Sequence, residues 1–174
     1  ANGITTNGNV LTAYRQNYLM IARANQVLAL IDASTIPDAT KKNVKGQALF
    51  LRALGYLDLV RYFNKAPLQL TPVSVRSEAA AALGTADQLY AQIIKDATEA
   101  VGLLPAKSVQ EAGRATSGSA RALLANVYMI QKKWSDAETQ LRAIVTSNEY
   151  SLMPNYADAF SNSTSNKNTK ESVF

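Results

Sequence analysis

The chain has 174 residues, 47% hydrophobic and 18% charged, a balance that suits one globular domain with a buried core. It contains no Cys and no His, which excludes disulfides, Cys/His metal sites, thiol nucleophiles and imidazole bases, and we expect no cofactor. The net charge of +5 comes from residues 1–80, but a nucleic-acid interface would need a denser basic patch interleaved with aromatic residues, so we expect no nucleic-acid partner.

The first predicted helix covers about residues 10–32, where apolar side chains recur at steps of three and four from Tyr14 to Leu28. Asn25 lies on this apolar stripe. We therefore expect its amide to be buried and to bond a neighbouring helix or loop, because an unpaired buried amide costs about 1 to 3 kcal/mol.

The second predicted helix, over about residues 37–63, should be central, because apolar residues cover most of its circumference. Pro37 suits the first turn of a helix. Arg52 lies in this segment, and we expect it to pair with a buried carboxylate or carbonyl in a structural role. Residues 64–84 then lose periodicity and contain two prolines, which predicts an irregular insertion of extended chain.

Capping patterns place the remaining helices. Thr85 with Gln88 forms a capping box that opens a third helix, and a fourth helix is predicted over about 117–132. Ser135 with Glu138 predicts a second capping box and a fifth helix.

Beyond the fifth helix, residues 156–160 predict a short helical turn. Residues 161–170 are rich in Ser, Asn and Thr, which predicts a low-complexity loop.

The second and fourth predicted helices repeat one pattern, AxxLxAxxY, in which small residues let a partner helix approach and a Tyr fills the wedge beside it. The repeat positions are Ala48, Leu51, Ala53, Tyr56, Ala120, Leu123, Ala125 and Tyr128, with Ala137 on the helix that follows the second copy. This is tetratricopeptide spacing, with the 64–84 insertion inside the first repeat; the alternative is coincidental Ala/Leu similarity. We predict an all-α fold of stacked helical hairpins, forming a single domain over 1–174.

One aromatic residue and two acidic pairs invite a functional interpretation. Trp134 has a flat face that could stack on a sugar, but it matches Tyr62 in the repeat, so we expect it to pack inside a hairpin. A glycosidase needs two carboxylates across a cleft. The pairs at 96 and 99 and at 136 and 138 each lie on one helix, where capping and solvation explain them, so we predict no catalytic residue.

Six blocks in order resemble the tetratricopeptide-like half of the SusD/RagB family, glycan-binding lipoproteins on the outer membrane of Bacteroidetes. The blocks are YLMIARANQVLALI, GQALFLRALGYLDLVRYFNKAPL, YAQIIKDATEAVGLLP, GRATSGSARALLANVYMIQKKWSDA, YSLMPNYADAF and ESVF. Three positions depart from the family pattern: Gln47 where Glu is usual, Asn64 where Gly is usual, and Ala66 where a larger aliphatic is common.

The resemblance implies a surface-exposed outer-membrane lipoprotein that takes up nutrients with a TonB-dependent transporter as partner and binds an oligosaccharide through the full-length protein. It implies no enzyme activity, a glycan surface that comes largely from loops and from the variable part of the full-length protein, and contact with the membrane only through a lipid anchor that the chain lacks. It does not identify the ligand-binding residues. We accordingly expect the chain to be a fragment of a longer protein. Two alternatives stay open: a generic tetratricopeptide adaptor that holds a peptide in its groove, and a glycoside hydrolase.

Overall fold

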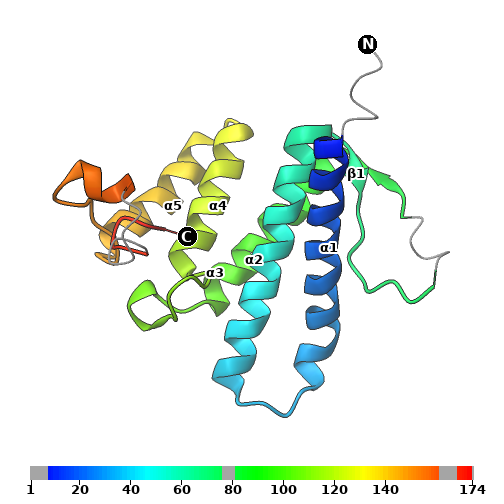
Figure 1. Cartoon of the computed structure of the whole chain (residues 1–174), viewed down its shortest axis with the longest axis horizontal. Coiled ribbons are helices and arrows are strands. Elements are labelled where there is room, and N and C mark those ends of the chain that lie inside the picture. Colours follow the sequence, from blue (N-terminus) through cyan, green and yellow to red (C-terminus); the bar gives the residue numbers. More distant parts are fainter. Residues whose placement is uncertain (1–7, 76–80, 161–167, 174) are drawn as a thin grey trace.

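Five α-helices, packed one against the next in chain order, make up most of the part of the chain that the structure describes (Figure 1). The structure is a computed structural model that describes residues 8–75, 81–160 and 168–173. Its elements are α1 (Gly8–Leu30), η1 (Ile31–Ala33), α2 (Asp38–Phe63), β1 (Ala66–Pro67), β2 (Leu83–Gly84), α3 (Ala86–Leu103), η3 (Lys107–Val109), α4 (Ser117–Ile130), α5 (Trp134–Thr146) and η4 (Tyr156–Phe160). The predicted all-α hairpin fold is thus confirmed. None of these helices is long and apolar enough to cross a membrane.

The second helix is the centre of the stack, as its all-round apolar sequence predicts. It packs against both α1 and α3, and it supplies more buried residues than any other described helix. Its small residues allow these close contacts: a Cβ atom added to Gly55 would lie 3.0 Å from Ile21 of α1. At the far end of the stack, α5 packs mainly on α4 and has a single buried residue, Ala137.

The predicted capping box of α3 is confirmed, because the Thr85 hydroxyl accepts from the Gln88 backbone and the Gln88 side chain accepts from the Thr85 backbone. The second predicted box, at Ser135, is wrong. The backbone takes a left-handed turn at Lys132 (φ 59°), and α5 already begins at Trp134, without a side-chain cap. Because α4 ends at Ile130, two residues before its predicted end, the connection to α5 lies earlier along the chain and Ser135 falls inside α5.

The side chains at 62 and 134 do not pack inside the hairpins, contrary to prediction. Tyr62 is 68% exposed and Trp134 is 63% exposed. Leu141 and Val145 of α5 are also exposed, by 42% and 74%. One neighbouring helix covers only part of the circumference of α5, so most of its apolar surface faces outward.

The two ends of the insertion between α2 and α3 lie next to each other. Asn64 ends α2 with a positive φ of 60°, which Asn adopts more readily than most other non-glycine residues, in keeping with the Gly that is usual here. The strands β1 and β2 then pair antiparallel, with Ala66 opposite Gly84. This short ladder, which periodicity did not predict, closes the base of the insertion.

The last described segment folds back on the loop between α3 and α4. Lys107 donates from its ammonium group to the carbonyls of Thr169 and Ser172 and lies over the Tyr150 ring at 5.2 Å. The Tyr150 hydroxyl is 2.8 Å from the Thr116 hydroxyl. Most of the predicted loop over 161–170 lies outside the described residues.

The substitution Gly118→Ala tests the contact between the Tyr150 side chain and the start of α4. The added Cβ would lie 2.2 Å from the Tyr150 hydroxyl oxygen, so the ring must move. We expect a loss of about 1–3 kcal/mol of stability in urea unfolding, with faster amide exchange near Tyr150. Gly102→Ala is the matched control: a Cβ there meets nothing within 4 Å inside α3, so stability should rise slightly. Equal effects of the two substitutions would contradict the packing described here.

Candidate functional site

A buried ionic network joins the first three helices. The guanidinium of Arg52, on α2, binds the Asp96 carboxylate of α3 through two bonds, Nε to Oδ2 at 2.7 Å and Nη2 to Oδ1 at 2.8 Å. Its Nη1 also donates to Oδ1 of Asn25 on α1, at 2.9 Å. All three residues are nearly inaccessible: Arg52 is 8% exposed, and Asn25 and Asp96 are each 1% exposed. Bidentate pairing and the additional bonds offset the cost of removing two charges from water.

The same network holds the insertion against the helices. The Asn25 amide donates to the carbonyls of Gln69, at 3.0 Å, and Thr71, at 3.3 Å. Arg52 Nη1 donates to the carbonyl of Leu70 at 3.3 Å. Three successive carbonyls of a segment without regular secondary structure thus find donors on α1 and α2, so the buried polar side chains position this part of the insertion.

Two tyrosines add to this anchorage. Tyr18 donates its hydroxyl to the carbonyl of Pro67 at 2.8 Å, and Tyr56 donates to that of Gln69 at 2.6 Å. Burial raises the pKa of Tyr56 to about 12, and burial together with the nearby Tyr14 raises the pKa of Tyr18 further. Both phenols therefore keep their protons, and stay donors, to higher pH than an ordinary tyrosine.

Alkaline pH should destabilise the fold through these phenols. In the unfolded chain a tyrosine releases its proton near its ordinary pKa of 10.0, whereas the folded chain keeps the proton until higher pH. The contribution to stability is thus complete below pH 10 and is lost as pH rises toward 12. Urea unfolding at several pH values between about 9 and 12 would measure the slope. Tyr56→Phe should reduce it, and an unchanged slope would contradict this assignment.

The acidic pairs occupy separate environments. Asp96 was expected on a solvated helix face, and this is wrong: it is buried, and both its oxygens accept hydrogen bonds, from Arg52 and from Gln92 at 2.7 Å. Glu99 is at the surface, 3.6 Å from Lys45. Asp136 is exposed, and Glu138 is exposed and pairs with Arg142 at 2.6 Å. Each of these four carboxylates is either solvated or bonded to neighbouring side chains, and no two of them face each other across a cleft.

The repeat positions serve packing. Ala53, Tyr56, Ala120 and Ala125 are fully buried, Ala48, Leu123 and Ala137 are nearly so, and Leu51 and Tyr128 are half-buried. The two copies therefore differ in how deeply the tyrosine is buried. The insertion covers the tyrosine of the first copy, whereas no insertion follows the second copy.

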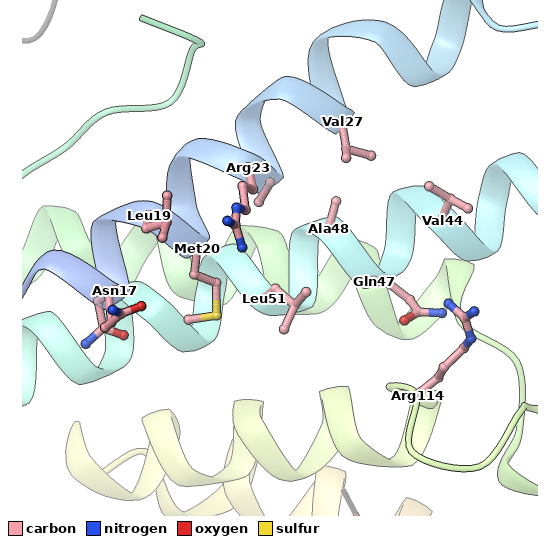
Figure 2. A pocket seen from close by; sticks show the side chains of 12 residues that line it. Asn17, Leu19, Met20, Arg23, Val27, Val44, Gln47, Ala48, Leu51 and Arg114 are labelled. Carbon is pink, nitrogen blue, oxygen red and sulfur yellow. The ribbon is translucent and has the colours of Figure 1, made fainter. Parts of the chain in front are cut away.

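A groove of about 570 Å³ runs between α1 and α2 and reaches the loop before α4 (Figure 2). Its lining residues are Gln16, Asn17, Leu19, Met20, Arg23, Ala24, Val27, Val44, Gln47, Ala48, Leu51 and Arg114. Figure 2 shows Arg114 pointing toward Gln47 at one end, while Arg23 reaches down from α1. Apolar side chains with amides and guanidiniums, but no aromatic ring, suit a polypeptide segment better than a stacked sugar. Sequence reasoning missed this groove, since it forms only where two helices meet.

Comparison with known proteins assigns the family. A family model named SusD-like and described as "Starch-binding associating with outer membrane" matches residues 2–129. The chain belongs to the SusD-like family. A SusD-like protein from Bacteroides ovatus is 27% identical over 179 residues, which cover 95% of this chain and 32% of that protein. SusD-like protein P2 from Formosa agariphila is 31% identical, covering 88% of this chain and 31% of that protein. The SusD-like chain thus spans about a third of the length of these relatives.

Solved structures agree with this assignment. A SusD superfamily protein from Bacteroides vulgatus superposes with a TM-score of 0.84 at 26% identity, over 92% of this chain and 35% of that one. A laminarin-binding SusD-like protein gives 0.78 at 30% identity, over 86% and 34% of the two chains. Surface glycan-binding protein A from Bacteroides uniformis gives 0.78 at 28% identity, over 87% and 35%. The predicted membership of the SusD/RagB family is confirmed.

Proposed function

We propose that this SusD-like chain is the helical scaffold of a surface glycan-binding protein that works with a TonB-dependent transporter in nutrient uptake. The observation that carries the proposal is the family match over residues 2–129, to a family described as starch-binding and associated with the outer membrane. Two structural neighbours are named as a laminarin-binding SusD-like protein and as a surface glycan-binding protein. The proposed location is the outer-membrane surface, with attachment through a lipid anchor outside this chain.

The proposed contribution of the chain is positioning and docking, without catalysis. Its buried carboxylate, Asp96, is engaged on both oxygens, and the network around it fixes the insertion to α1 and α2. A rigid helical stack of this kind can hold loops and further domains at fixed positions. Because the chain spans about a third of its relatives, we expect much of the glycan surface to lie elsewhere in the full-length protein.

The test uses the full-length protein, with a glycan array and a pulldown against the TonB-dependent transporters of the same organism. We expect the full-length protein to retain both an oligosaccharide and the transporter, and the 174-residue chain to bind glycan weakly or not at all. Retention of neither partner by the full-length protein would overturn the proposal. Cleavage of the bound glycan would point instead to a hydrolase.

The groove between α1 and α2 supports a second candidate, a peptide-binding adaptor. Asn17, Arg23 and Arg114 on its lining are the residue types that such an adaptor uses to hold a peptide backbone or carboxylate. A displayed peptide library should then yield binders whose affinity falls with Arg23→Glu. Binders that are insensitive to this substitution, or none at all, would argue against the adaptor.

A further inference from the structure

Residues 168–173, called the strap below, are held on the loop between α3 and α4 by a single lysine. The ammonium group of Lys107, in η3 of that loop, donates to the carbonyls of Thr169 and Ser172 in the strap. It also lies over the Tyr150 ring, 5.2 Å from the ring centre. Carbonyl oxygens and the face of an aromatic ring both attract a cation, so these contacts depend on the positive charge of the amine.

The carboxylates around Lys107 do not neutralise this charge. Among the residues that the structure describes, no ion pair includes Lys107. The acidic side chains of the three segments around it bond other groups: Glu111 pairs with Arg114, Glu149 accepts from the backbone and hydroxyl of Ser108, and Glu171 accepts from the backbone of Met153. The strap is therefore held by carbonyl dipoles around one positive charge.

Apolar packing contributes little to this contact. No described residue of the strap belongs to the hydrophobic core or packs against it. A pocket of about 150 Å³ lies between the strap and the loop, lined by Lys107, Gln110, Glu111, Ala112, Gly113, Arg114 and Thr116 of the loop and by Asn168, Ser172 and Val173 of the strap. A segment with few buried apolar contacts opens locally at a small cost in free energy, so its polar bonds decide whether it stays closed.

The charge of Lys107 is itself easier to lose than that of an exposed lysine. Burial lowers the pKa of Lys107, because its ammonium lies partly out of water. The other charged or titratable side chains of the segments packed around it are Glu111, Arg114, Glu149, Tyr150, Lys170 and Glu171.

We propose that the positive charge of Lys107 holds the strap closed on the loop between α3 and α4, and that loss of this charge releases it. Arg114 lines both the pocket under the strap and the groove between α1 and α2, so the strap borders one end of that groove. Release of the strap therefore changes the surroundings of the groove at this end. The proposal stands whether or not the protein binds a glycan.

Amide hydrogen exchange in the full-length protein gives a direct test. The backbone of Ser151 donates to the carbonyl of Lys170 at 3.1 Å, so exchange of peptides over 148–155 and 168–173 reports on the strap. We expect Lys107→Ala to accelerate exchange there at least about tenfold and to leave exchange in α4 unchanged. Lys133→Ala, at an exposed lysine between α4 and α5, is the control and should change neither peptide.

Chemical rescue separates the charge of Lys107 from its volume. Added n-propylammonium chloride supplies the part of the side chain that Lys107→Ala removes, so it should restore slow exchange, whereas 1-propanol should not. Lys107→Met keeps an apolar stem without the charge and should open the strap as the alanine variant does.

Three outcomes would overturn the proposal. Wild-type exchange in both variants would show that other contacts hold the strap. Equal rescue by 1-propanol would show that the volume of the side chain matters and its charge does not. Faster exchange throughout α4 in both variants would identify a general loss of stability instead of a released strap.

Discussion

Replacing Arg52 by methionine is expected to lower the free energy of unfolding by about 3–5 kcal/mol, because it leaves the Asp96 carboxylate buried without its partner. Methionine fills a similar volume, so the loss reports charge rather than a cavity. Urea unfolding followed by circular dichroism measures it. Arg142→Met is the matched control, since Arg142 and Glu138 are 76% and 58% exposed, and its effect should stay below about 1 kcal/mol.

A double substitution separates the ion pair from the rest of the network. Arg52→Met combined with Asp96→Leu removes both charges, so it should recover part of the stability that Arg52→Met loses. The insertion should still loosen, because Leu70 loses the donor that Arg52 supplies. Amide hydrogen exchange over residues 66–73 is therefore expected to accelerate in both variants. Wild-type stability and exchange in the Arg52→Met protein would refute this role of the network.

Tyr56→Ala is expected to cost about 3–5 kcal/mol, as for other fully buried aromatic side chains. The repeat supplies its own control: Tyr128 holds the same position in the second copy of AxxLxAxxY but is half-buried, so Tyr128→Ala should cost clearly less. Tyr56→Phe isolates the bond to the Gln69 carbonyl and should cost about 1 kcal/mol. Urea midpoints and slopes of the three variants make the comparison. Similar losses for both alanine variants would show that the insertion does not distinguish the two copies.

Much of the fold could be predicted from the sequence, because its signals are local. Steps of three and four, Pro37 and the Thr85 capping box located helices whose observed ends differ from the predicted ones by a few residues. The same periodicity pointed to Asn25 as a polar residue on an apolar stripe, and the structure places it at 1% exposure. The family resemblance, carried by six blocks in order, pointed to the SusD-like family that the comparisons identify.

The burial of Asp96, the carboxylate of the network, was not predicted, although its spacing from apolar residues indicated it. Leu89, Ile93, Asp96 and Ala100 follow one another at steps of four, three and four, the pattern that drew attention to Asn25. Asp96 was instead paired with Glu99 and assigned to a solvated face. Applying the stripe criterion to every polar residue of a predicted helix would have found it.

The sequence alone determined where the helices lie, that their hairpins repeat, and which family the chain resembles, because these features depend on neighbours along the chain. Only the tertiary structure decided that Arg52 reaches Asp96 across 44 residues, that Arg52 also bonds a carbonyl of the insertion, and that Trp134 faces outward. Periodicity shows that a helix has an apolar side, but whether that side is buried depends on what packs against it. Neighbouring helices cover the apolar side of α2, whereas much of the apolar side of α5 is exposed.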